Sequence, residues 1–187
     1  LDQGRCAAKN PAQTASLLGK ACRGNIRAAC LRLAGILERG NVATPRDIPR
    51  AMSLYNQACE AGDAGACFNL GLRWEDGRAG QKDQVRAAAL FRAACEKGYA
   101  PGCFNFGVKL WWGDGVAKSL RDAAAFFKRA CDGGEMHGCF RLGRMLELGE
   151  GAKKNPKGAA PLLQRACAAG IKKACPPDRA STAPPSK

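Results

Sequence analysis

Apolar residues recur along most of this chain at the spacing of an amphipathic α-helix. Four stretches carry small and bulky apolar residues at positions i, i+3, i+4 and i+7, so each predicts a helix with one buried stripe. We expect Pro161, inside the last stretch, to bend that helix, because proline removes a backbone hydrogen bond. The four sets are Ala51, Leu54, Tyr55 and Ala58; Ala87, Leu90, Phe91 and Ala94; Ala123, Phe126, Phe127 and Ala130; and Ala159, Leu162, Leu163 and Ala166.

A second set of helices is predicted between these stretches. Each begins near a cysteine, and they run through LRLAGILERG, FNLGLRWEDG, FNFGVKLWWG and FRLGRMLELG. In the second of them Cys67, Leu70, Gly71 and Trp74 share one face, which we expect to be the core face. The glycine of that face recurs at positions 107 and 143 and would let the two sets of helices approach closely.

Polar residues and glycines mark the ends of the first set of helices. Glycines at positions 62, 98, 134 and 170 can adopt positive φ and end these helices. At each start stands a residue whose side chain can cap a helix N-terminus, and one such residue opens a further helix near the beginning of the chain. The capping residues are Asn10, Asp47, Asp83, Ser119 and Asn155.

The whole pattern repeats with a period of 36 residues. Such a period is typical of stacked helical pairs, so it predicts an all-α solenoid of helix-turn-helix repeats in which each unit contacts only its neighbours. We expect a single domain over residues 10–175, a flexible leader at 1–9 and a disordered tail at 176–187. The predicted units are a half repeat at 10–29 and full repeats at 30–66, 67–102, 103–138 and 139–174.

Ten of the eleven cysteines form five pairs, and each pair encloses seven residues. Regular pairs of this kind indicate disulfides or metal ligands. Zinc sites use shorter spacings and further ligands, and the chain has one histidine, so the pattern favours disulfides and no metal site. A disulfide at each repeat junction indicates an oxidising compartment such as a periplasm or the cell exterior. The pairs are Cys22 and Cys30, Cys59 and Cys67, Cys95 and Cys103, Cys131 and Cys139, and Cys167 and Cys175.

Cys6 lies outside this frame, and a free thiol, an intermolecular bridge or a lost upstream partner all remain open for it. The first ten residues, LDQGRCAAKN, lack an apolar signal core, so we expect that an exported protein has already lost its signal. The sequence has no run of about 18 apolar residues, so it predicts no transmembrane segment.

The run Cys-Phe-Asn-Leu-Gly at 67–71, its near-copies at 103–107 and 139–143, the recurring Ala-Ala pairs and the cysteine spacing resemble the cysteine-rich branch of the Sel-one-like repeat (SLR) family, relatives of tetratricopeptide repeats. The resemblance implies a right-handed α-solenoid with one disulfide in each unit, whose first helices line a concave surface. It also implies an adaptor that holds other proteins. Family members include periplasmic signalling components, immunity proteins against toxins delivered between bacteria, and β-lactam-binding proteins. Ala34 departs from the family glycine, and the first repeat has an insertion near Thr44.

Opposite the core face, the first helix of each repeat carries cations mixed with apolar and aromatic side chains. This composition is typical of a protein-binding surface, although a solvated helix face is the alternative. Lys and Arg outnumber Asp and Glu by 30 to 16, and the formal charge of +14 favours an acidic protein, an anionic membrane surface or nucleic acid as partner, without choosing among them. The predicted partner-binding residues are Arg32, Arg39, Asn69, Arg73, Asn105, Lys109, Trp112, Arg141 and Arg144.

The sequence offers little for catalysis. His137, the only histidine, lies in the predicted inter-repeat turn GGEMHGC, and we interpret it as a loop residue rather than a catalytic base. No serine has a lysine three positions later, so the penicillin-binding signature is absent. We expect no enzyme activity and no cofactor.

Together these features favour an exported protein-protein interaction scaffold that binds an acidic partner in a basic groove. The narrower hypothesis, which rests on the family resemblance, is a periplasmic immunity protein or inhibitor of a secreted bacterial toxin. The alternatives are a signalling or envelope adaptor that binds polyanions or cell-envelope components, and a β-lactam-binding hydrolase. No nucleic-acid partner is expected, and the sequence leaves the partner and the oligomeric state open.

Overall fold

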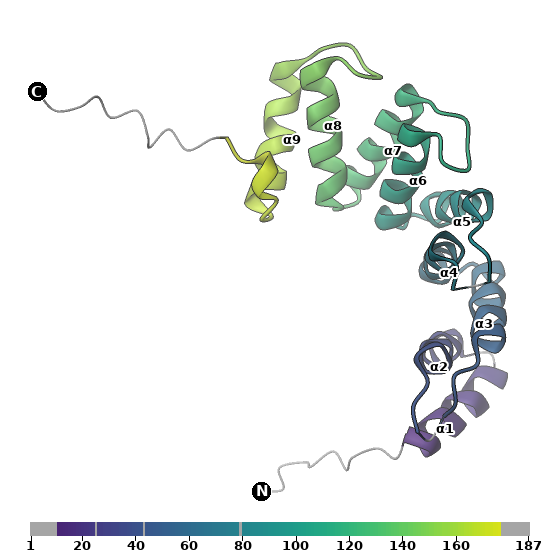
Figure 1. Cartoon of the computed structure of the whole chain (residues 1–187). Helices are drawn as coiled ribbons and strands as arrows, with labels where there is room; N and C mark the ends of the chain where they lie inside the picture. The colour runs from purple at the N-terminus through teal and green to yellow at the C-terminus, as the bar shows by residue number, and fades with distance from the viewer. Residues whose placement is uncertain (1–10, 25, 43, 79, 177–187) are drawn as a thin grey trace, which may run out of the picture.

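The computed structural model describes residues 11–24, 26–42, 44–78 and 80–176 as a chain of helices (Figure 1). Within these ranges there is no β-strand beyond one isolated bridge between Asn41 and Thr44. The helices are α1 (Pro11–Arg23), α2 (Arg27–Arg39), α3 (Ile48–Glu60), α4 (Ala64–Asp76), α5 (Gln84–Glu96), α6 (Ala100–Trp112), α7 (Leu120–Asp132), α8 (Met136–Leu148), α9 (Pro156–Ala168) and the short 3-10 helix η1 (Lys172–Ala174).

The predicted capping residues begin the odd-numbered helices from α3 onward. Asp47, Asp83, Ser119 and Asn155 each accept a hydrogen bond from the backbone N–H three residues later, which satisfies a donor that the first helical turn leaves unpaired. Asn10 and the whole predicted leader, including Cys6, lie outside the described residues, as does most of the predicted tail. α9 continues through Pro161 to Ala168, so this proline does not end the helix.

The even-numbered helices begin earlier than the sequence pattern suggested. α4 starts at Ala64, one turn before Cys67, because the Asp63 side chain caps it by accepting a hydrogen bond from the Ala66 amide. α8 likewise starts at Met136, so His137 belongs to the first turn of a helix and not to a loop as predicted.

Alanines and glycines let the paired helices pack closely. A Cβ on Gly71 would lie 2.8 Å from a ring carbon of Phe91, and a Cβ on Gly107 would lie equally near Phe127. Both rings are almost fully buried, so the absence of a side chain on the α4 and α6 glycines makes room for them. The predicted core face of the even-numbered helices is therefore confirmed.

All five predicted disulfides are present, with Cα–Cα distances from 4.4 Å to 4.8 Å. Each joins the end of an odd-numbered helix to the next helix or, after α9, to the segment that follows η1. Closing a loop of this size contributes about 2.5 kcal/mol in the chain-entropy model. The bridges therefore stiffen every junction along the stack.

The helices pack in chain order, each mainly against the helix before it and the helix after it. The stack forms a curved rod, with α2 and α4 on the inner side of the curve and α3 on the outer side (Figure 1). For α2 and α4 this arrangement agrees with the prediction that the first helix of a repeat lines the concave surface.

Candidate functional site

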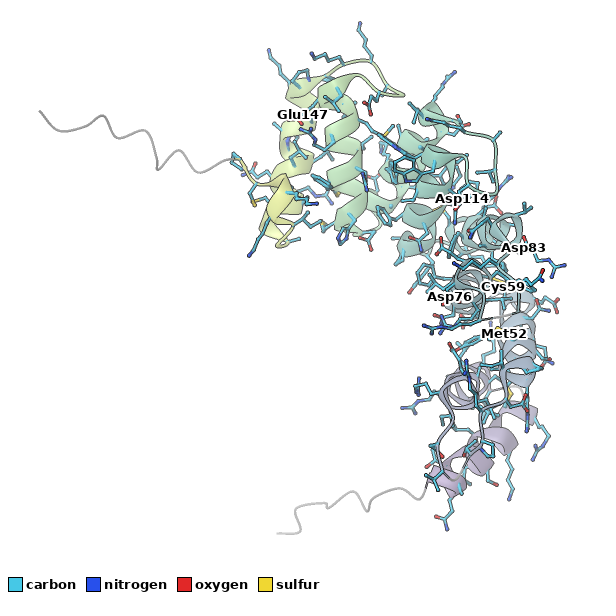
Figure 2. The ribbon with its side chains drawn as sticks, viewed as in Figure 1. Met52, Cys59, Asp76, Asp83, Asp114 and Glu147 are labelled. Carbon is cyan, nitrogen blue, oxygen red and sulfur yellow. A yellow bond between two sulfur atoms is a disulfide. The ribbon has the colours of Figure 1, made fainter. Side chains whose placement is uncertain are left out.

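The helices α2, α4, α6 and α8 hold equivalent positions in successive repeats, and we call the surface made of their exposed sides the inner face. Because successive repeats are 36 or 37 residues apart, equivalent side chains line up in columns along it. The columns are Arg32, Asn69, Asn105 and Arg141; Gly35, Leu72, Val108 and Arg144; and Arg39, Asp76, Trp112 and Leu148. Asp76 lies near the inner side of the curve, at the end of α4 (Figure 2).

The structure places the nine predicted partner-binding residues in three settings. Arg32, Arg39, Arg141, Arg144 and Trp112 are exposed, and Trp112 reaches 68% exposure. Asn69 and Asn105 are half-buried. Arg73 and Lys109 are held in ion pairs inside the stack, so their charges are not free to meet a partner.

Arg73 takes part in a buried network with Glu38. Its Nη2 donates to Oε2 of Glu38 at 2.7 Å, and Arg78 adds a second guanidinium 3.2 Å from Oε1. Tyr55 approaches the same carboxylate from α3, with its hydroxyl 3.5 Å from Oε2. Glu38 is only 8% exposed, so this carboxylate is stabilised by two cations in place of water.

The network shifts the titration of its members. Burial raises the pKa of the Glu38 carboxyl, but the hydrogen bond and charge of Arg73, with those of Arg78, lower it more, so the pKa lies below that of an ordinary glutamate. Burial lowers the pKa of Arg73, and its hydrogen bond to Glu38 raises it above the usual range. Burial and the Glu38 charge raise the pKa of the Tyr55 phenol.

Lys109 occupies the equivalent place one repeat later. Its Nζ lies 2.6 Å from Oε1 of Glu75 and 2.7 Å from Oδ2 of Asp114, and it also donates to Gln84. The residue is 3% exposed, and Asp114 reaches it from the loop after α6, where Figure 2 labels it. Two carboxylates and an amide therefore surround this ammonium group.

These two networks follow one rule. A glutamate near the end of one even-numbered helix pairs with a cation of the next, as in Glu38 with Arg73 and Glu75 with Lys109. At the following junction the two equivalent positions hold apolar residues, Trp111 and Met145. Trp111 packs against the core cluster that contains the fully buried Met145. Met145 is a core residue because it occupies the column of Arg73 and Lys109, which points into the repeat junction.

The last glutamate of this column, Glu147, pairs within its own helix, with Arg144 at 2.6 Å. Both line a pocket of about 670 Å³ between α8, α9 and η1. Figure 2 places Glu147 on this part of the stack. Among the predicted partner-binding residues that the structure describes, the cations without an ion pair are Arg32 and Arg39 in α2 and Arg141 in α8, near the two ends of the inner face.

Our sequence reasoning missed the acidic partners Glu38 and Glu75. The signal was available, since each stands 34 or 35 residues before the cation that it contacts. Counting charges along one helix concealed this relation, because the two members belong to different repeats.

The structure gathers four predicted residues around one pocket of about 530 Å³ at the α2 end of the inner face. Arg32, Arg39, Asn69 and Arg73 line it. Tyr55 of α3 also lines it, together with the apolar side chains of Leu18, Leu31 and Ile36. We call it the α2 pocket. Its lining residues are Thr14, Leu18, Leu31, Arg32, Gly35, Ile36, Arg39, Tyr55, Asn69 and Arg73.

The opposite end of the inner face is apolar and aromatic. Trp112 and Leu148 are 68% and 55% exposed and occupy the same column in neighbouring repeats. Arg141 lies on the same face of α8 as Leu148, two helical turns earlier. Large exposed apolar groups beside a cation are typical of anchoring positions in protein interfaces.

Across the described ranges, every helix is too short or too polar to cross a membrane.

Comparisons with known proteins agree with this geometry. Solved structures with the same fold include a protective antigen of uropathogenic Escherichia coli strains, with a TM-score of 0.81 and 25% identity over 86% of this chain and 34% of that one. This chain thus spans about a third of that protein. Helicobacter pylori cysteine rich protein B is 30% identical, with a TM-score of 0.56 over 73% of this chain and 96% of that one. An immunity protein from Pseudomonas aeruginosa shares the fold at 20% identity, with a TM-score of 0.55 over 88% of this chain and 60% of that one.

No curated protein sequence matches the chain. The family model of the Sel1 repeat matches at residues 27–63, 64–99, 100–135 and 137–171, which together form most of the chain. The matched boundaries fall at the starts of α2, α4 and α6 and beside the start of α8, so the family repeat and the structural repeat coincide. The chain therefore belongs to the Sel1 repeat family.

Proposed function

We propose that this Sel1 repeat protein-interaction scaffold binds an acidic segment of a partner protein along its inner face. The supporting observation is the distribution of free groups on that face. Arg32 and Arg39 surround an open pocket at one end, and Trp112, Leu148 and Arg141 are exposed at the other. An extended segment with carboxylates at one end and apolar side chains at the other would complement both ends.

Rigidity supports the same function. Five disulfides lock the junctions, and the Glu38 and Glu75 ion pairs join successive even-numbered helices. A preformed surface loses little conformational entropy on binding, which favours tight association with one partner.

We further propose that the protein works outside the cytoplasm, in a periplasm or after secretion, as an immunity protein or inhibitor of a bacterial toxin. Five disulfides are favoured by an oxidising compartment. The likeness to the P. aeruginosa immunity protein supports the narrower role at the level of fold.

A second candidate function, binding to polyanions of the cell envelope, is favoured by the formal charge of +14. This binding would weaken steeply with salt and would be indifferent to the shape of the ligand. Binding of a protein through the inner face would persist at salt concentrations that remove a polyanion.

A capture experiment with matched variants tests the proposal. The purified protein would be immobilised and exposed to a periplasmic extract, and the captured proteins would be compared with those bound by two quadruple variants. The first carries Arg32→Ala, Arg39→Ala, Trp112→Ala and Arg141→Ala on the inner face. The control carries Arg50→Ala, Arg121→Ala, Lys157→Ala and Val85→Ala, which removes three exposed cations and one exposed apolar side chain from the odd-numbered helices.

A salt concentration on the order of 0.5 M screens exposed charges within a few ångströms. At this concentration we expect the wild type and the control variant to retain a partner protein that the inner-face variant loses. Equal capture by the two variants would contradict the assignment of this face.

A further inference from the structure

The α2 pocket exists because the first full repeat departs from the others at two positions. Gly35 occupies a column in which the later repeats carry Leu72, Val108 and Arg144. Tyr55 occupies a column in which the later repeats carry Phe91, Phe127 and Leu163. One change removes a side chain from the inner face, and the other adds a hydroxyl beneath it.

The two departures meet in space. A Cβ on Gly35 would lie 3.5 Å from Nη1 of Arg39 and 3.8 Å from the Tyr55 hydroxyl oxygen. The guanidinium and the phenol therefore converge on the opening that Gly35 leaves. In the repeats of α4 and α6, Leu72 and Val108 occupy this position and pack against the core cluster.

The charges around the pocket are unbalanced. Glu38, the acidic group beside it, is already paired with Arg73 and Arg78. Within the described ranges of the chain, neither Arg32 nor Arg39 forms an ion pair. Two guanidinium groups on one face of α2 thus stand over a pocket with no carboxylate left to meet them.

The remaining lining suits an acid with a short apolar stem. Leu18, Leu31 and Ile36 form apolar walls, and Asn69 adds an amide at the junction with α4. Guanidinium groups bind carboxylates through paired, charge-assisted hydrogen bonds. The two methylenes of a glutamate would lie against the apolar walls while its carboxylate meets the arginines.

We infer that the α2 pocket binds the side-chain carboxylate of a glutamate from the partner protein, held by Arg32 and Arg39 above Gly35 and Tyr55. The inference rests on the proposed function and names the group by which an acidic partner is anchored.

Nuclear magnetic resonance titration of the full chain tests it without a known partner. The main probe is N-acetyl-glutamate N-methylamide, whose one charge is the side-chain carboxylate. The glutamine analogue removes that charge, N-acetyl-leucine presents a terminal carboxylate, and inorganic phosphate presents a different anion. We expect the glutamate probe alone to give saturable shifts of the Arg32, Arg39 and Asn69 side-chain signals.

Two substitutions at one position separate closure of the pocket from loss of the fold. Gly35→Leu fills the opening as Leu72 does in the next repeat, and we expect binding of the glutamate probe to weaken roughly tenfold or more, as the loss of one charge-assisted contact implies. Gly35→Ala fits without a clash and should bind within about twofold of the wild type, a change that is small beside the loss of one contact. Arg121→Gln, an exposed cation in α7, should leave binding unchanged.

Equal shifts with the glutamate and glutamine probes, shifts with phosphate or N-acetyl-leucine alone, or full binding by Gly35→Leu would overturn the inference. These outcomes are independent of the capture experiment. If capture depends on Trp112 and Arg141 but the glutamate probe does not bind, the proposed partner binding stands and the α2 pocket has no part in it.

Discussion

The Nε atom of Arg73 lies 2.7 Å from Oε1 of Glu38 across the junction between α4 and α2. The two residues are 35 positions apart in sequence, and their contact exists only because consecutive repeats stack. The same relation recurs between Glu75 and Lys109. Arg73 and Lys109, which the sequence pattern assigns to partner binding, therefore form ion pairs that join successive repeats.

Removing the Glu38 carboxylate should destabilise the protein. Glu38→Gln leaves Arg73 without its anionic partner in a largely buried place, and we expect a loss of about 1–3 kcal/mol. Glu96→Gln, which breaks the exposed pair with Arg92, should change stability by less than about 0.5 kcal/mol. Calorimetric melting of both variants beside the wild type measures the difference, and equal melting temperatures would contradict the structural role of Glu38.

The contribution of Glu38 should depend on pH in one direction. The pKa of the Glu38 carboxyl is lower in the folded protein than in the unfolded chain. Its contribution to the free energy of unfolding is therefore complete above the ordinary glutamate pKa of about 4.3, and it is lost as the pH falls below that value towards the folded pKa. The gap in melting temperature between the wild type and Glu38→Gln should therefore stay constant from pH 7 to about pH 5, roughly one unit above that value, and narrow below it. A gap that widens in acid would reverse the assigned sign.

Alanine should have opposite effects at two glycines of the even-numbered helices. At Gly35 a Cβ has no contact shorter than 3.5 Å, so Gly35→Ala should stabilise α2 by about 0.5–1 kcal/mol through backbone entropy. At Gly107 a Cβ would lie 2.8 Å from the Phe127 ring, so Gly107→Ala should destabilise the fold by about 1–3 kcal/mol. Chemical denaturation of the two variants gives both signs, and two stabilised proteins would disprove the close approach of α6 and α7.

Loss of a central disulfide should be more harmful than loss of the first one. Cys95 and Cys103 are 0% and 3% exposed, whereas Cys22 and Cys30 are half-buried near the start of the stack. Replacing the central pair with alanines should lower stability by about 2–5 kcal/mol, and replacing the first pair should have a smaller effect. Thiol titration of the native wild type before melting provides the control, and ten or more reactive thiols would show that the bridges do not form.

Much of the fold could be predicted because it depends on local sequence patterns that recur in each repeat. The cap at Asp83, the alanine stripe of α5 and the glycine at 71 follow from residues within one repeat, and the Cys95–Cys103 bridge follows from two cysteines that are close in sequence. The start of α4 was placed late because its cap, Asp63, lies in a turn that the periodic pattern does not reach.

The stack of disulfide-linked helical pairs could be predicted from the amino-acid sequence alone, because helix periodicity, capping and short-range bridges depend on residues that are close in sequence. Which cations of the inner face lack an ion pair became visible only once the repeats were stacked in three dimensions. Arg73 and Lys109 are neutralised by the preceding repeat, while Arg32 and Arg39 stand over the space that Gly35 leaves. The physical reason is that an ion pair depends on the distance between two side chains, and stacking brings residues of different repeats to within 3 Å of each other.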